Sequence, residues 1–250
     1  RLAAAGFREL VLTGIHLRQW GRDLGIEDGF AQLMRQLRQI DGIDRLRLSS
    51  IGEGAFTDSF LKAFEDDEGL CRFFHVPIQS GSDTVLDRMQ RGYTVQQYVD
   101  AMTKVRTRLP KAIIATDVIV GFPGETEQDF EATLEVIEKL RFQKVHLFPY
   151  SPRPRTKAAR LDGHLPPAIR QHRMQRARQL CDAVQDQEQL NRVGDQVRVL
   201  IESVEPQQKG FLAEGLSREG LRVVIQERDC DELSRGTEVA AIIQETRGSK

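Results

Sequence analysis

The sequence has little cysteine, no long apolar run and almost no net charge. Its three cysteines, Cys71, Cys181 and Cys230, lie far apart among 250 residues and form no CxxC or CxxxC spacing. We therefore expect a reducing compartment, no structural disulfide and no metal-binding loop of neighbouring cysteines. No apolar run approaches the roughly 20 residues that span a bilayer, and no charged-then-apolar leader opens the chain. These absences predict a cytoplasmic protein without membrane contact.

The composition allows one sizeable core and a small second unit. Hydrophobic residues make up 40% of the chain and charged residues 29%. The formal net charge of -1 excludes a uniformly basic nucleic-acid binder, so any such contact must come from a local patch. The chain opens at Arg1 with a short run that is typical of a helix end before Gly6. We expect that it begins within a domain.

The first 160 residues alternate strand and helix patterns. Apolar, β-rich runs recur at roughly 30-residue spacing, each followed by one or two amphipathic helices with capping residues such as Ser82, Thr94 and Thr126. This order predicts an α/β fold with right-handed βα units, a parallel barrel or part of one, which binds ligands at the carboxyl ends of its strands. The expected strands are 9–13, 45–49, 73–78, 112–120 and 144–148.

The pattern changes after residue 160. Residues 166–191 predict a long polar helix, and the period-two runs from Gly194 onward predict a compact all-β barrel of five short strands. The expected units are a partial barrel (1–160), a helical connector (161–190) and a β-barrel (191–250).

Two strand ends carry candidate ligand-binding residues. The strand that contains Val118, Ile119 and Val120 ends at Gly121, where glycine lets the backbone approach a flat ligand. An ordinary turn that leads to a helix capped by Thr126 is the alternative. The second strand end offers the Gln79 amide, the Ser80 hydroxyl and backbone N–H groups, which suit a ribose or a carboxylate; here the alternative is a helix cap by Ser82 alone.

Polar residues recur at other strand ends. Thr13 and Gly14 close the first run, and Ser49 with Ser50 closes the second, so these tips are expected to share one barrel mouth. His16 is interpreted as a surface or capping residue because no metal-ligand partners are evident, and His146 as a packed strand residue.

Several motifs together resemble the radical S-adenosylmethionine methylthiotransferases. Their number and order are far more specific than any one of them, and the resemblance covers the whole chain. Residues 191–250 resemble the OB-like, RNA-binding TRAM domain of that family by pattern more than by identity. The motifs are VLTGIH (11–16), RLRLSSI (45–51), HVPIQSGSDTVLDRMQRGYT (75–94), TDVIVGFPGETEQDF (116–130) and HLFPYSPRPRTKAA (146–159).

The resemblance implies that the strand ends hold S-adenosylmethionine beside a 4Fe-4S cluster. It implies contacts with the methionine part for Thr13 and Gly14, with the ribose or carboxylate for Gln79 and Ser80, and with the cofactor at the mouth for Ser49. The adenine-side residues would be Val118, Ile119, Val120, Gly121, Phe148, Pro149 and Tyr150.

Three departures from the family pattern stand out. The CxxxCxxC loop whose thiolates bind the cluster does not occur in this chain, and its three cysteines are too scattered to replace it. Gly52 and Glu53 stand where the family has Glu-Pro, so the acid is displaced by one position or lost. Arg155 stands where glycine is expected, which predicts a shifted loop path.

The resemblance is strongest to the branch that thiomethylates threonylcarbamoyladenosine in tRNA. Thr13 to His16 favour this branch over those that act on isopentenyladenosine in tRNA or on a ribosomal protein. The implied reaction needs tRNA and an electron donor for the cluster, and we expect this chain alone to be inactive. One rival hypothesis is a non-catalytic RNA-binding protein with a degenerate barrel; another is an aldolase-like enzyme, for which no lysine or acid pair at the strand ends is found.

A basic segment follows the last expected strand. Residues 151–180 contain eight lysines or arginines against one acid, Asp162, and could track a phosphate backbone. A solvated helix face is the alternative, but the position between the barrel mouth and the β-domain favours RNA. The predicted RNA contacts are Arg153, Arg155, Lys157, Arg160, Arg170 and Arg173, with Arg176 and Arg178 completing the segment.

Overall fold

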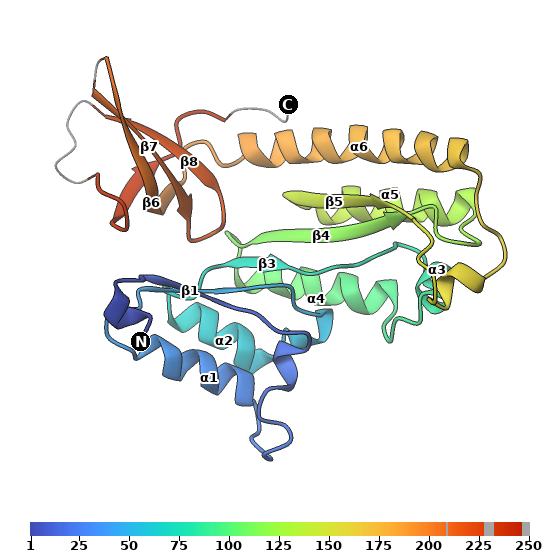
Figure 1. Ribbon diagram of the computed structural model, residues 1–250, viewed down its shortest axis with the longest axis horizontal. Helices are drawn as coiled ribbons and strands as arrows, with labels where there is room; N and C mark the ends of the chain where they lie inside the picture. Colours follow the sequence, from blue (N-terminus) through green and yellow to red (C-terminus); the bar gives the residue numbers. More distant parts are fainter. Residues whose placement is uncertain (209, 228–232, 247–250) are drawn as a thin grey trace.

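A computed structural model describes residues 1–208, 210–227 and 233–246 of the chain. Its larger part contains five parallel strands in sequence order (Figure 1). Two pair as β1-β2 and three as β3-β4-β5, and backbone bonds from Leu46 N to Gly69 O (2.8 Å) and from Cys71 N to Leu46 O (2.9 Å) join the two groups. The strands are β1 (Glu9–Leu12), β2 (Arg45–Leu48), β3 (Phe73–His75), β4 (Ile113–Val120) and β5 (Lys144–Pro149).

A row of helices covers one face of this parallel layer. Neighbours in the row pack in the order α1, α2, α4, α5 and α6, which follows the order of the strands (Figure 1). The βα alternation and the parallel direction expected from the sequence are confirmed. The helices are α1 (Gly29–Arg38), α2 (Asp58–Asp66), α3 (Asp83–Arg88), α4 (Val95–Arg108), α5 (Glu127–Leu140) and α6 (Pro167–Leu190), with short 3-10 turns η1 (Ala3–Ala5), η2 (Leu17–Gln19), η3 (Glu53–Ala55) and η4 (Ala158–Arg160).

Side-chain caps fix where the helices begin. The Ser82 hydroxyl accepts from Val85 N at the start of α3, and Thr94 forms a capping box with Gln97 at the start of α4. Thr126 forms a second capping box with Asp129 at the start of α5. These caps set the positions at which the chain leaves the strand ends and turns back over the sheet.

The core lies between the helices and the covered face of the sheet. Alternate strand residues point into it, including Leu46, Phe74, Ile114 and Val118, which are almost fully buried. Phenylalanines from the first half pack around Phe60 in stacked, edge-on and tilted arrangements, with ring centroids 5.0 to 6.3 Å apart. The opposite, open face of the sheet carries Val11, His75, Asp117, Ile119, His146 and Phe148, all half-buried or exposed.

Helix α6 packs on the barrel rather than only linking two units. Met174, Ala177 and Cys181 are buried, and α6 contacts α5, β4 and β5. The helix sequence is mostly polar because only one side of α6, with Met174, Ala177 and Cys181, packs against the rest of the protein. No helix in the described part of the chain has the combination of length and apolarity that crossing a membrane requires.

The C-terminal part is a small antiparallel sheet in the order β8-β7-β6-β9. Four strands lie in the described residues, where five were expected, and residues 228–232 are outside the description. The glycines at 210 and 215 predict turns from the sequence, but both lie in a strand, Gly210–Ser217 (β7), where a Cβ at Gly215 would lie 2.3 Å from Leu200 O of the neighbouring strand. The strands are β6 (Gln196–Gln207), β7 (Gly210–Ser217), β8 (Arg222–Glu227) and β9 (Glu238–Ile242).

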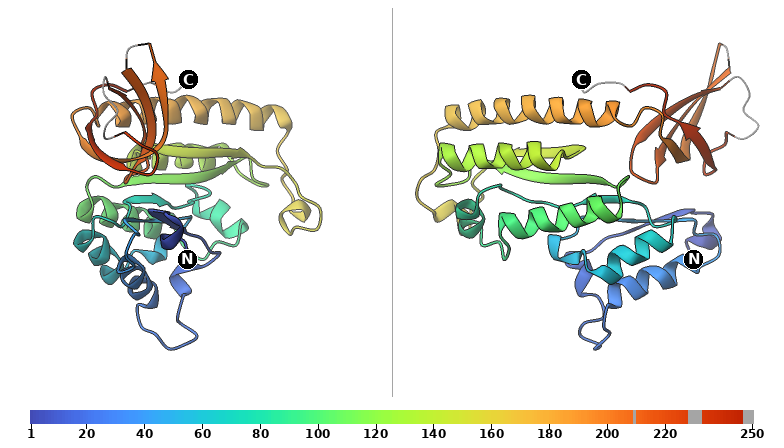
Figure 2. Two further views of the ribbon diagram at one scale, coloured as in Figure 1. Left: turned by 60° about the vertical axis from the view of Figure 1, so that its left-hand side comes forward. Right: turned by 180° about the vertical axis from the view of Figure 1, so that it is seen from behind.

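This β-domain lies at the amino-terminal ends of the parallel strands (Figures 1 and 2). Arg45, fully buried, donates from Nη1 to Leu216 O (2.9 Å) and from Nη2 to Ser217 O (3.0 Å). Its Nε lies 2.8 Å from Glu9 Oε2 without the alignment of a hydrogen bond, and its Nη1 lies 3.4 Å from Glu238. Arg47 Nη2 donates a second hydrogen bond to Ser217 O, at 2.9 Å. Buried guanidinium groups therefore join the two parts.

Replacing Arg45 tests this junction. Arg45→Met keeps most of the side-chain volume but leaves the Glu9 and Glu238 carboxylates with less compensation, so we expect the free energy of unfolding to fall by roughly 3–5 kcal/mol. The control Arg8→Met removes an ion pair with Asp44 whose partners are half exposed, and should cost less than about 1 kcal/mol. Urea unfolding followed by circular dichroism measures both, and equal losses would contradict the assigned role of Arg45.

Candidate functional site

The carboxyl ends of the five parallel strands meet at one edge of the sheet. Backbone bonds link neighbouring tips there: Ser49 N to Leu12 O, Ile51 N to His75 O, Ile119 N to Gln79 O and Tyr150 N to Val120 O, at 2.8 to 2.9 Å. The expectation that the polar strand ends share an edge is confirmed. This edge lies opposite the β-domain (Figure 1).

A buried carboxylate shapes the turn at the end of β4. Gly121 has φ +78°, and its N–H donates to both carboxylate oxygens of Glu125 at 3.0 and 3.1 Å. Arg173 from α6 donates to Glu125 Oε1 at 2.7 Å and to its carbonyl oxygen at 3.1 Å. Burial raises the pKa of Glu125, and the Arg173 guanidinium opposes that rise. The buried Glu125 carboxylate therefore stabilises the turn, and Arg173 connects the turn to α6.

Strand alternation decides which β4 residues can meet a ligand through their side chains. Val118 and Val120 are buried beneath the helices, at 0% and 1% exposure. Ile119 lies on the open face, where β5 places Phe148 as its register partner. Of the three predicted apolar contacts, only Ile119 offers its side chain, while Val118 and Val120 offer backbone alone.

The segment after β3 also contains one predicted residue that is partly open and one that is buried. Gln79 is half-buried with φ +70° and bonds through its backbone to Asp117 O and Ile119 N. Ser80 is buried, and its hydroxyl contacts Thr133 of α5 and Ser82 N. The Ser80 hydroxyl therefore faces protein rather than a ligand space. The cap by Ser82, the plainer interpretation of this motif, is confirmed.

The two earlier strand ends are more open. Thr13 and Gly14 are exposed, and Ser49 is half-buried. A Cβ at Gly14 would lie 2.8 Å from the flexible Leu17 side chain, so glycine lets the chain turn closely here. Their role toward a ligand stays a prediction.

The end of β5 leads into a groove beside α6. Phe148 and Pro149 are exposed, while Tyr150 is buried against Phe122 and His164, with its hydroxyl unpartnered among the described residues. A groove of about 700 Å³ begins at Pro149, Tyr150 and Ser151 and runs along α6 to Asp182. Among the predicted adenine-side residues of β5, Phe148 therefore lies on the open face, whereas the Tyr150 side chain points into the interior.

Three polar side chains on the open face form a cluster that the sequence analysis missed. His75 Nε2 lies 2.7 Å from Asp117 Oδ1, and His146 Nδ1 lies 3.0 Å from the same oxygen. Ser50 Oγ lies 2.6 Å from His75 Nδ1. His146 was interpreted as a packed residue, but the register Asp117↔His146 brings it onto the carboxylate. No local sequence signal marks the cluster, because it depends on the register that pairs His75 with Ala115 and Asp117 with His146.

The described cysteines do not fit an iron–sulfur cluster. Cys71 lies buried near Glu9, and Cys181 lies on α6 in a different layer. Burial raises the pKa of the Cys71 thiol and raises that of Cys181 to about 12, which keeps both protonated rather than metal-binding. Cys230 is outside the described residues. The two described cysteines therefore offer no set of converging thiolates.

The basic segment separates into two groups. Arg173 is buried on Glu125, and Arg170 donates to Tyr150 O, so both predicted RNA contacts already hold the fold. Arg155 has φ +70°, the left-handed conformation that favours the glycine expected there, while the predicted shift of the loop path stays a prediction. The exposed cations at this edge are Arg153, Arg155, Lys157 and Arg160.

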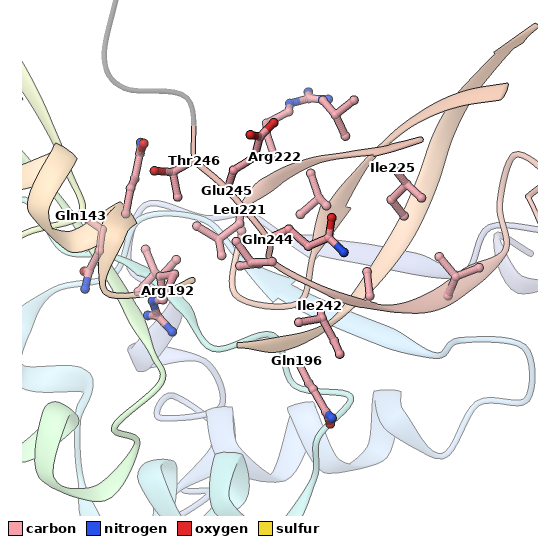
Figure 3. A pocket seen from close by; sticks show the side chains of 18 of the residues that line it. Gln143, Arg192, Gln196, Leu221, Arg222, Ile225, Ile242, Gln244, Glu245 and Thr246 are labelled. Carbon is pink, nitrogen blue, oxygen red and sulfur yellow. The ribbon is translucent and has the colours of Figure 1, made fainter. Parts of the chain in front are cut away.

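A larger cavity lies at the other end of the sheet. It has a volume of about 1360 Å³ between the β-domain, the end of α6 and the starts of β3, β4 and β5. Figure 3 shows Gln143 and Arg192 on one side of it and Leu221 and Ile242 on the other. None of the site residues predicted from the sequence lines it.

The Gly121 turn can be tested directly. Gly121→Ala places a side chain in the left-handed region and against Arg170, so we expect unfolding free energy to fall by about 1–2 kcal/mol. Gly52→Ala is the matched control, because Gly52 has φ -81° and open space around its Cβ, and should change stability by less than about 0.5 kcal/mol. Thermal or urea unfolding measures both, and a neutral Gly121→Ala would contradict the assigned constraint.

Comparisons with known proteins agree with this geometry. The family model "Radical SAM superfamily" matches residues 6–137. A solved structure of coproporphyrinogen III oxidase from Escherichia coli, a radical SAM enzyme, has a similar fold, with a TM-score of 0.51 and 16% identity over 62% of this chain and 37% of that one.

Curated relatives narrow the family. The chain is 35% identical over 85% of its length to a tRNA-2-methylthio-N(6)-dimethylallyladenosine synthase of Pelotomaculum thermopropionicum, covering 47% of it. It is 41% identical over 78% of its length to the synthase of that name in Paenarthrobacter aurescens, covering 38% of it. It is 39% identical over 79% of its length to a threonylcarbamoyladenosine tRNA methylthiotransferase of Thermotoga maritima, covering 45% of it.

The chain spans less than half the length of these relatives, and both substrate classes match it at similar identity. Radical SAM proteins use S-adenosylmethionine together with a 4Fe-4S cluster. The same family is indicated by the match over residues 6–137, by the parallel strands and by the named relatives. This chain belongs to the radical SAM superfamily and, within it, to the methylthiotransferase family.

Proposed function

We propose that the protein containing this chain replaces the C2 hydrogen of an adenine in tRNA with a methylthio group, using S-adenosylmethionine. The nucleotide we assign is N6-threonylcarbamoyladenosine. The observation that carries the proposal is the meeting of five parallel strand tips at one edge, in a chain of the methylthiotransferase family. One molecule of S-adenosylmethionine, cleaved by one electron from the donor, gives methionine and a deoxyadenosyl radical that takes the C2 hydrogen as 5′-deoxyadenosine. A separate sulfur donor supplies the sulfur of the new C–S bond, and a second molecule of S-adenosylmethionine supplies the methyl group.

In this proposal the residues of β4 and β5 hold the adenosyl part. Gly121 lets the backbone approach the ring, while Ile119 and Phe148 offer apolar side chains on the open face. Gln79, at the neighbouring tip, provides an amide for the ribose or carboxylate, and Thr13, Gly14 and Ser49 complete the edge toward the methionine part. The two described cysteines are buried away from this edge, so in this proposal the cluster ligands come from residues other than these.

We propose that tRNA lies across the edge that carries Arg153, Arg155, Lys157 and Arg160. These exposed cations follow β5 and adjoin the groove along α6, so they border the same mouth as the adenosyl residues. We assign the β-domain as a TRAM-type RNA-binding unit. It lies at the far end of the sheet and would contact a different part of the tRNA.

A second candidate substrate is dimethylallyl- or isopentenyladenosine in tRNA. It is favoured by relatives of that name at 35% to 41% identity. A non-catalytic RNA-binding protein is the remaining rival, favoured by the absence of the CxxxCxxC spacing from this chain. The first experiment below separates the three.

Deletion of the encoding gene tests the reaction and its substrate. We expect 2-methylthio-N6-threonylcarbamoyladenosine to disappear from hydrolysed tRNA while 2-methylthio-dimethylallyladenosine stays, as measured by liquid chromatography and mass spectrometry. Loss of the second nucleoside instead would support the dimethylallyl substrate, and loss of neither would reject the tRNA reaction.

Re-expression in the deletion strain tests the site. The intact gene should restore the nucleoside, and Ile119→Asp should not, because a charge at this strand tip opposes adenosyl binding. Leu24→Asp is the control, since Leu24 is 71% exposed in a distant loop. Equal restoration by the two variants would contradict the placement of the adenosyl group.

Salt dependence tests the RNA surface. Replacing Lys157 and Arg160 with alanine removes two exposed cations, so the slope of log K against log salt for tRNA binding should become shallower by about 2. The control pair Arg22→Ala and Arg35→Ala removes the same charge from exposed positions at and before α1 and should leave the slope nearly unchanged. Filter binding or fluorescence anisotropy over a salt series measures both, and equal slopes for the two double variants would contradict the proposed surface.

A further inference from the structure

Three side chains on the open face of the sheet converge as metal ligands would. His75, Asp117 and His146 each place one ligand atom within 4.8 Å of those of the other two. They come from β3, β4 and β5, three adjacent strands whose backbone ladder fixes their spacing. From these contacts we infer that His75, Asp117 and His146 form a binding site for a divalent transition-metal ion.

The spacing of the donor atoms suits such an ion. Imidazole nitrogen and carboxylate oxygen bind Zn²⁺ at about 2.0–2.2 Å, which places neighbouring ligand atoms roughly 3 Å apart. The two distances to Asp117 Oδ1, 2.7 Å from His75 and 3.0 Å from His146, are already close to that value. Only small rotations of the side chains are needed to admit the ion.

The surroundings of the ligands support the assignment. Ser50 Oγ, 2.6 Å from His75 Nδ1, can accept its N–H and so leave the Nε2 lone pair free for the metal. The only partners of the Asp117 side chain among the described residues are the two imidazoles, with no lysine or arginine beside it. A carboxylate that is 21% exposed thus faces two imidazoles and forms no ion pair with a lysine or arginine among the described residues.

The donor set selects the class of ion. Two imidazoles with one carboxylate favour Zn²⁺, Fe²⁺, Co²⁺ or Ni²⁺ over Mg²⁺ and Ca²⁺, which prefer oxygen ligands. Three protein ligands leave at least one coordination position, and His146 is 39% exposed on the open side. The site could therefore accept water or a substrate atom. It contains no thiolate, so it is separate from the family's 4Fe-4S cluster, and it does not depend on the proposed function.

Metal titration of the chain, purified without a histidine tag, tests the site. We expect one equivalent of Zn²⁺ by calorimetry, and Co²⁺ should give visible d–d bands without the strong near-ultraviolet bands of thiolate coordination. Mg²⁺ should not compete. Asp117→Asn and His146→Asn, which nearly conserve shape, should each lower Zn²⁺ affinity at least tenfold.

Two further variants separate a ligand effect from misfolding. Ser50→Ala keeps all three ligands but removes the hydrogen bond that orients His75, so affinity should fall by about tenfold or more. His172→Gln removes an exposed histidine of α6 and should leave affinity unchanged. Circular dichroism of each apoprotein reports its fold. Absence of Co²⁺ bands in the unaltered chain, or equal Zn²⁺ affinity in the Asp117→Asn, His146→Asn and His172→Gln proteins, would overturn the proposal.

Discussion

The parallel alignment of five strands is the constraint on which the site depends. Parallel strands joined by helices bring every carboxyl end to the same edge, so residues from Thr13 to Tyr150 meet there although some 140 positions separate them in sequence. Because side chains alternate along a strand, the same alignment also places every second side chain of each strand on the same face of the sheet. It thereby produces both the polar edge proposed to bind the adenosyl group and the cluster around Asp117.

Buried ion pairs hold the two ends of this layer. At the carboxyl edge, Arg173 neutralises Glu125, whose carboxylate accepts the Gly121 N–H, so α6 and the β4 turn form one unit. At the amino edge, Arg45 and Arg47 cross from the sheet to carbonyl oxygens of the β-domain. Buried guanidinium groups need partners in fixed directions, and they therefore define how the helix and the β-domain sit on the barrel.

The sequence predicted the elements well because their signals are local. Strand runs, helix stripes and caps such as Thr94 with Gln97 depend on neighbours within a few residues, and they appear near the predicted positions. β7 was missed because its glycines allow two strands to approach closely, as at Gly215. From the sequence alone, such a glycine cannot be distinguished from a glycine in a turn.

Side-chain direction was harder to predict than strand position. Ser80 and Arg173 belong to motifs that suggest ligand contact, yet both are buried against protein, in partnerships with Thr133 and Glu125 that are 53 and 48 residues away. The approach of His146 to Asp117 depends on the register between β4 and β5, which no local pattern reveals. Motif resemblance identified the edge of the sheet; the alternation of each strand decides which residues face it.

Photo-cross-linking with an 8-azidoadenosyl analogue of S-adenosylmethionine tests most directly whether this edge holds an adenosyl group. Peptide mass spectrometry would locate the labelled residues. We expect labels within residues 116–126 or 146–150, at the tips of β4 and β5, with protection by excess unmodified S-adenosylmethionine. Labels confined to the β-domain or to the large cavity beside it, with the strand tips unlabelled, would contradict the assignment.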